Sequence, residues 1–188
     1  MNNILKDISI YLIGMMGAGK TTVGHLLAQE LGYSRFFDTD ALIEQLAKGQ
    51  TINEIFATVG EETFRELETQ VLAELCTYKR TVVSTGGGIV LRQKNWSYLQ
   101  HGLIVWLDVP VELLIKRLTE DNTRPLLKDA DLEKKLQTLL AQRQPLYSQA
   151  DLRITVQAQE TPEQITKRIL EEIPSVLKPP AVPPTDFN

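Results

Sequence analysis

The chain has 188 residues, 43% of them hydrophobic, which supports one well-buried domain and is short for two. Its formal net charge of −4, with no basic block, argues against nucleic acid or an anionic membrane as a general partner. The single cysteine excludes an intramolecular disulfide framework, and the sequence contains no membrane-spanning apolar run. From the residues before the first predicted strand we expect no leader segment. We therefore expect a cytoplasmic protein.

Short apolar runs rich in β-branched residues alternate with segments whose apolar residues recur at helical spacing. The runs predict strands at 8–13, 35–37, 81–84, 103–107 and 152–156. The helical segments predict helices at 20–31, 40–48, 60–78, 92–100, 111–119, 132–147 and 162–172. Because strands that alternate with helices form βαβ units, the sequence predicts an α/β domain with a parallel sheet covered on both faces.

The stretch Gly14-Met-Met-Gly-Ala-Gly-Lys20-Thr21 fits the pattern G-x-x-x-x-G-K-[ST] and lies between the first predicted strand and the first predicted helix. That context is typical of a P-loop, in which backbone N–H groups and a helix N-terminus surround phosphate. Lys20 would reach the β- and γ-phosphates, and the Thr21 hydroxyl suits Mg²⁺. The alternative is a glycine-rich turn with an unrelated lysine. The P-loop interpretation predicts nucleotide contacts from Gly14, Gly17, Ala18, Gly19, Lys20, Thr21 and Thr22.

Two aspartates, Asp38 and Asp40, follow the second predicted strand. In an extended segment the side chains of residues i and i+2 project to one face, so both carboxylates would point into the ligand crevice of a parallel sheet. One could hold Mg²⁺ or its water, while the other accepts hydrogen bonds from substrate hydroxyls. The alternative for Asp40 is an N-cap of the next helix.

Three consecutive glycines, Gly86, Gly87 and Gly88, follow the third predicted strand. Without side chains they expose backbone N–H groups that a ligand can approach closely. The alternative is an ordinary turn between a strand and a helix.

Two arginines lie on predicted helices in different settings. Arg65 is off the apolar stripe of its helix and four residues after Glu61, so a surface ion pair is the alternative to a binding role. Arg143 continues the apolar stripe of its helix, so its guanidinium must either reach solvent or meet an anion. Its planar fork suits a carboxylate or a phosphate.

In the polar segment 120–131 the apolar residues follow neither helical nor strand spacing, and the segment connects two predicted helices. A long polar connection of this kind is typical of a lid. Arg124 within it could close over a transferring phosphate, or be a solvated loop charge. For Arg117, on the predicted helix at 111–119, the sequence pattern does not distinguish a binding role from a structural one. Asp108 imitates the Walker B acid, but we assign it to a turn because Pro110 suits the start of the next helix.

The C-terminal segment 174–188 is rich in proline, which lacks a backbone donor. We expect it to be disordered or polyproline-like and dispensable for chemistry. The predicted domain therefore ends at residue 173.

In their order and spacing these motifs resemble the shikimate kinase family over about residues 8–172. The resemblance is carried by the P-loop and by the motifs Asp38-Thr-Asp40, Phe64-Arg65, Gly86-Gly-Gly88, Thr123-Arg-Pro-Leu-Leu127 and Arg143-Gln-Pro-Leu-Tyr147. It implies a P-loop three-layer α/β/α fold of the nucleoside-monophosphate-kinase type. The parallel sheet would have five strands in the order 2-3-1-4-5, beside a mobile lid. It also implies a monomer that uses ATP with Mg²⁺ and phosphorylates the 3-hydroxyl of shikimate.

The same resemblance implies a role for each site residue. Asp40 would bind the ring hydroxyls, while Arg65 and Arg143 hold the carboxylate and Gly86 to Gly88 offer main-chain donors. Asp38 would lie near Mg²⁺ and the attacking hydroxyl, and either aspartate could accept its proton. Arg124 would be the lid arginine, Arg117 would flank the adenine, and the loop 157–162 would border it. The catalytic set is then Lys20, Asp38, Asp40 and Arg124, with Thr21 and Asp38 at the metal.

Three rival functions are compatible with a P-loop. One is another small-molecule kinase that acts on gluconate or a nucleoside monophosphate. A GTPase switch is a second, although the sequence lacks the Asn-Lys-x-Asp motif that reads guanine. The third is a non-catalytic relative that only binds nucleotide, against which the intact set of charged motif residues argues.

Overall fold

The computed structural model describes residues 7–120 and 132–177. Arg124, nearly all of the predicted lid and the tail from residue 178 lie outside these ranges. Within them, no helix is both long enough and apolar enough to cross a membrane.

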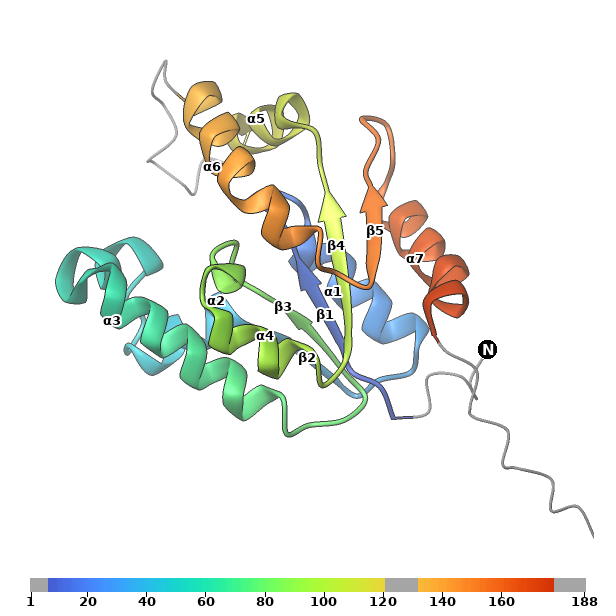
Figure 1. Cartoon of the computed structure of the whole chain (residues 1–188), viewed down its shortest axis with the longest axis horizontal. Coiled ribbons are helices and arrows are strands. Elements are labelled where there is room, and N and C mark those ends of the chain that lie inside the picture. Colours follow the sequence, from blue (N-terminus) through green and yellow to red (C-terminus); the bar gives the residue numbers. More distant parts are fainter. Residues whose placement is uncertain (1–6, 121–131, 178–188) are drawn as a thin grey trace, which may run out of the picture.

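A five-stranded parallel sheet forms the centre of the molecule (Figure 1). Its strands lie in the order β2-β3-β1-β4-β5, which confirms the order implied by the resemblance. Their bounds are β1 Ile10–Ile13, β2 Arg35–Asp38, β3 Thr81–Ser84, β4 Leu103–Asp108 and β5 Leu152–Thr155. Every residue of β1 and β3 is buried, as expected for strands covered on both faces.

Helices cover both faces of the sheet. Their bounds are α1 Lys20–Glu30, α2 Thr39–Leu46, α3 Ile52–Leu75, α4 Gln93–Leu99, α5 Val111–Glu120, α6 Leu132–Tyr147 and α7 Pro162–Val176, with a short 3-10 helix η1 at Ile89–Leu91. α1 packs against α7 on one side of the sheet, and α3 packs against α4 on the other (Figure 1).

Helix α3 begins well before the residue 60 that the apolar pattern predicted, and it ends at Leu75 rather than 78. Thr51 and Glu54 form a capping box that satisfies the first N–H groups. The helix is kinked at Gly60, where φ is 79° and ψ is 167°. This left-handed backbone suits glycine, and it explains why helical spacing was recognised only beyond it.

Helix α7 extends past the predicted end of the domain at residue 173. We expected regular structure to stop at Pro174, yet the helix continues to Val176. A proline in the last turn removes one hydrogen bond, whereas Val176 and Leu177 both pack against the core. Burial therefore outweighs the missing donor, and regular structure continues three residues past the predicted boundary.

Three of the predicted site motifs lie at the carboxyl ends of strands of the sheet. The P-loop follows β1, Asp38 ends β2, and the three glycines follow β3. Since these three strands are parallel neighbours, their carboxyl ends open together into one crevice, where ligands of open α/β sheets bind.

Candidate active site

The P-loop turns between β1 and α1 with Gly17 and Gly19 in left-handed conformations, at φ values of 77° and 89°. Gly19 caps α1 without a side-chain hydrogen bond, so the first N–H groups of the helix remain available to an anion. Lys20 is 8% exposed, and its Nζ donates to the carbonyl oxygens of Gly14 at 2.9 Å and Met15 at 2.8 Å. The loop therefore holds a buried cation beside a helix N-terminus, which is the arrangement predicted for phosphate.

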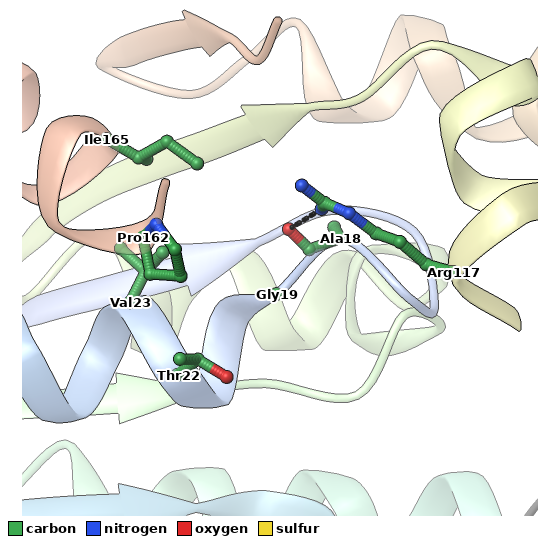
Figure 2. Close-up of a pocket in the computed structure, with 7 residues that line it drawn as sticks. All are labelled: Ala18, Gly19, Thr22, Val23, Arg117, Pro162 and Ile165. Carbon is green, nitrogen blue, oxygen red and sulfur yellow. Dashed lines mark hydrogen bonds between the residues drawn. The ribbon is translucent and has the colours of Figure 1, made fainter. Parts of the chain in front are cut away.

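A pocket of about 300 Å³ opens beside the P-loop (Figure 2). Arg117 reaches into it from α5 and donates from Nη1 to the Ala18 carbonyl oxygen at 3.2 Å. Burial lowers the pKa of Arg117. The rest of the lining is mostly apolar, and the full set is Ala18, Gly19, Thr22, Val23, Arg117, Pro162 and Ile165. A partly apolar space with one guanidinium next to a phosphate loop suits a nucleotide base.

Asp38 is the N-cap of α2, a role that the sequence analysis had offered as the alternative for Asp40. Its Oδ1 accepts hydrogen bonds from the N–H groups of Asp40 and Ala41, at 3.0 and 3.2 Å. Its Oδ2 accepts one from the Thr21 hydroxyl at 2.6 Å, and Ser84 Oγ lies 3.3 Å from that hydroxyl. Asp38 therefore links the P-loop to the ends of β2 and β3.

The oxygens of Thr21, Asp38 and Ser84 form a hard donor set of the kind that Mg²⁺ takes. Within the described ranges, no three His, Cys, Asp or Glu residues cluster as an all-protein metal cage. A single carboxylate with hydroxyls nevertheless fits Mg²⁺, because this ion usually keeps several waters and substrate phosphates as ligands. The residues predicted for the metal are therefore together.

The glycine loop after β3 is packed too tightly for side chains. A Cβ on Gly86 would lie 2.6 Å from Asp40 Oδ1 and 2.7 Å from Glu68 Oε1. The Gly86 N–H donates to the hydroxyl of the fully buried Thr39 at 2.9 Å. Gly86 therefore serves by letting two carboxylates approach, and its N–H is not an open donor, in contrast to what the resemblance implied.

Arg65 is almost buried, although a surface ion pair was the alternative for it. Its side chain is 12% exposed, and it pairs with Glu61 at 3.2 Å and with Glu68 at 2.5 Å. The Arg65 Nε is buried without a hydrogen-bond partner among the described residues. Its Nη1 would lie 2.1 Å from a Cβ on Gly88, so the guanidinium rests against the glycine loop. A buried cation with a spare donor is suited to a further anion.

Glu68 is a site residue that the sequence analysis missed, as are Thr39 and Ser84, and only 1% of its surface is exposed. Burial raises the pKa of Glu68; Arg65 opposes this rise, and Asp40 adds to it. Its position in the sequence could have identified it, since Glu68 lies four residues after Phe64 and three before Val71, which are both on the apolar stripe of the helix. An acid on the buried face of a helix indicates a buried partner.

Arg143 approaches the same loop from α6. It is 8% exposed, and its Nη1 donates to the Gly87 carbonyl oxygen at 3.1 Å. The guanidinium therefore does not reach out to solvent, and this hydrogen bond goes to a main-chain carbonyl. Arg65 and Arg143 flank the glycine loop from two different helices.

Asp108 does not serve the predicted turn. Its Oδ2 accepts from Arg153 Nε at 3.0 Å and Nη2 at 2.7 Å, on the neighbouring strand β5. The ion pair joins β4 to β5, and the N–H groups of Leu113 and Leu114 at the start of α5 bond to the Pro110 carbonyl instead. Asp108 is a link between strands.

The raised pKa of Glu68 predicts a pH dependence of stability. A carboxyl whose pKa is raised by folding contributes stability that is complete below its ordinary value of 4.5 and is lost as pH rises through the folded value. We therefore expect the free energy of unfolding of the wild type, minus that of Glu68→Gln, to fall as pH rises from 4.5 to neutral. Urea unfolding of both proteins across this range measures the difference.

Glu66→Gln is the matched control on the same helix. The hydrogen bond from Arg92 lowers the pKa of Glu66, so its contribution is already complete above pH 4.5. The corresponding difference for Glu66→Gln should stay flat over that range. A wild type that gains stability over Glu68→Gln with rising pH would contradict the assigned direction.

Comparison with known proteins agrees with this geometry. The family model for shikimate kinase matches residues 16–174. A shikimate kinase of Trichormus variabilis is 65% identical over 178 residues, covering 95% of this chain and 97% of that protein. One of a Nostoc species is 63% identical over 178 residues, with the same two coverages of 95% and 97%. The structure of shikimate kinase from Acinetobacter baumannii in complex with shikimate is 43% identical, with a TM-score of 0.84, and covers 92% of this chain and 96% of that one.

Proposed function

This chain belongs to the shikimate kinase family, and we propose that it transfers the γ-phosphoryl group of ATP to the 3-hydroxyl of shikimate. The product would be shikimate 3-phosphate, an intermediate of aromatic amino acid (chorismate) biosynthesis. The observation that carries the proposal is the pair of nearly buried guanidiniums, Arg65 and Arg143, against a glycine loop beside the P-loop. A small acid with vicinal hydroxyls needs cations for its carboxylate and an acceptor for its diol.

The acceptor end of the site would bind the acid. The carboxylate of shikimate would lie between Arg65 and Arg143, where planar guanidiniums give charge-assisted hydrogen bonds. Glu68 keeps Arg65 in place through their ion pair. Backbone N–H groups of Gly87 and Gly88 would complete the contact, since the Gly86 N–H is held by Thr39.

Asp40 is our candidate for binding the reactive hydroxyl and accepting its proton. The two oxygens of Asp38 already accept three hydrogen bonds, from the Thr21 hydroxyl and from two N–H groups of α2. Asp40 instead turns its Oδ1 toward the glycine loop, where a Cβ on Gly86 would meet it at 2.6 Å. Asp38 is thereby suited to orient the P-loop hydroxyl and Asp40 to orient the substrate.

The donor end would hold ATP with its base in the pocket of Arg117 and its phosphates along the P-loop. Lys20 would exchange its loop carbonyl partners for the β- and γ-phosphates and neutralise charge that develops during transfer. Thr21 and Asp38 would hold Mg²⁺, which when bound offsets phosphate charge. Because phosphoryl transfer needs mainly alignment and charge stabilisation, the parts described suffice for catalysis together with the predicted lid arginine, Arg124.

We further propose that the protein works as a monomer in the cytoplasm, without a nucleic-acid or membrane partner. Its net charge of −4 supports the absence of nucleic acid and of an anionic membrane as partners. ATP and shikimate would be its only small-molecule partners.

An ADP-release assay with ATP and Mg²⁺ tests the activity directly. We expect turnover with shikimate and only background hydrolysis without it, or with gluconate or a nucleoside monophosphate in its place. Phosphorus NMR would identify shikimate 3-phosphate. Equal ADP release with and without shikimate, or preference for another acceptor, would contradict the proposed function.

A further inference from the structure

Tyr147 is a buried tyrosine whose hydroxyl is directed at the active site. It ends α6 and is 0% exposed, with its ring stacked on Trp106 at a centroid distance of 5.7 Å. The hydroxyl donates to the Gly87 carbonyl oxygen at 2.7 Å and lies 3.7 Å from Met15 Sδ in the P-loop. A buried tyrosine needs a hydrogen-bond partner, and here that partner is a peptide of the glycine loop.

The Gly87 carbonyl has two donors, since Arg143 Nη1 also reaches it at 3.1 Å. A carbonyl oxygen has two lone pairs, so its acceptor capacity is filled. The peptide between Gly87 and Gly88 is flanked by two residues without Cβ atoms, so neither residue restricts the rotation of the peptide through a side chain of its own. Its orientation therefore depends on donors from outside the loop.

The orientation of that carbonyl decides where a second group points. In a planar trans peptide the N–H lies opposite the C=O, so the Gly88 N–H points away from Tyr147. Gly88 is also the glycine against which the Arg65 guanidinium rests. We propose that Tyr147 is a positioning residue whose hydroxyl holds the Gly87–Gly88 peptide so that the Gly88 N–H is presented to the carboxylate of the acid substrate. The inference rests on the proposed function, because it assigns a role toward that substrate.

Tyr147 suits this task better than Arg143 does. Burial raises the pKa of Tyr147 even though Arg143 opposes the rise, so the hydroxyl keeps its proton and remains a donor around neutral pH. Arg143 has to share its donors with the substrate carboxylate. The tyrosine hydroxyl has no such second duty and can hold the peptide before and after binding.

The test compares Tyr147→Phe with the matched control Tyr33→Phe. Tyr33 donates to the Ile8 carbonyl at 2.8 Å, which is the same kind of bond but at the opposite end of β1 from the P-loop. We expect Tyr147→Phe to raise the Kd and KM for shikimate about five- to tenfold, the loss typical of one hydrogen bond. The KM for ATP should stay within about twofold. Tyr33→Phe should leave both substrate constants unchanged.

The Gly88 amide chemical shift, followed by NMR in the ligand-free proteins, tests the peptide itself without substrate, because this shift depends on the hydrogen bond that the carbonyl of the same peptide accepts from Tyr147. We expect the Gly88 amide signal to move in Tyr147→Phe and to keep its wild-type position in Tyr33→Phe. Wild-type protein that fails to phosphorylate shikimate would contradict the proposed function, while the Gly88 chemical shift would still test the peptide. An active wild type with unchanged shikimate Kd in Tyr147→Phe would overturn this inference alone. A Tyr147→Phe protein that does not fold, where Tyr33→Phe does, would also overturn it, because the hydroxyl would then serve the core.

Discussion

Replacing Lys20 by methionine should lower the turnover number at least about 100-fold, which corresponds to roughly 2.7 kcal/mol of transition-state stabilisation. Lys20 Nζ lies at the P-loop, within 2.9 Å of two of its carbonyl oxygens, and is therefore placed to meet phosphate at the start of α1. Methionine keeps the length of the side chain and removes the charge. Steady-state ADP release with saturating ATP and shikimate measures the loss.

Two controls separate chemistry from folding in this experiment. Lys20 is buried, so thermal unfolding of Lys20→Met must show that the domain remains folded at the assay temperature. Lys116→Met removes an exposed lysine from α5, next to Arg117, and should keep nearly full activity. If Lys20→Met retains more than about half of the wild-type turnover, the P-loop is not catalytic in the way assigned.

Removing Arg65 should weaken shikimate binding about 10- to 150-fold while ATP affinity stays nearly intact, because a hydrogen bond to a charged group contributes about 1.5–3 kcal/mol. The variant Arg65→Ala also strips the buried Glu68 of its counter-ion, which destabilises the fold. The double variant Arg65→Ala/Glu68→Gln removes that complication. We expect it to recover stability over the single variant without recovering shikimate affinity.

Arg117→Ala is the partner experiment with the opposite expectation. Because Arg117 lines the pocket beside the P-loop and bonds to Ala18, its loss should weaken ATP binding more than shikimate binding. Calorimetry with each ligand gives both dissociation constants for both variants. Exchanged phenotypes, with Arg65→Ala impaired in ATP and Arg117→Ala in shikimate, would refute the placement of the two ends of the site.

Much of the fold could be predicted because its signals are local in sequence. The strand at 81–84 was predicted to the residue, as was the helix at 132–147, since each shows a clean apolar pattern. The first eight residues of α3 were missed because the helix is kinked at Gly60, so the spacing of apolar residues is not continuous across that position. The capping box of Thr51 and Glu54 was a local signal that could have located the true start.

Site residues that belong to a sequence motif could be predicted, whereas those that are brought to the site by tertiary packing could not. The P-loop, Asp38 and the glycine loop are recognisable from residue types at fixed spacing. Thr39 and Glu68 are not, because their roles arise from contacts between elements far apart in the sequence, such as the hydrogen bond that the Gly86 N–H donates to the Thr39 hydroxyl. The sequence also left Arg65 and Arg143 undecided, since only the tertiary structure shows that the Arg143 side chain is buried and the Arg65 side chain nearly so.

The ion pair between Arg65 and Glu68 has a consequence for competing solutes. A guanidinium that carries its own buried counter-ion presents little uncompensated charge, so a chloride or phosphate ion gains less there than at a bare arginine. Under the proposed function, discrimination would then depend on shape, because a planar carboxylate attached to a ring with hydroxyls would also reach Asp40 and the glycine loop. Because that counter-ion is part of the protein and excluded from solvent, the occupancy of the acid site should depend only weakly on ionic strength.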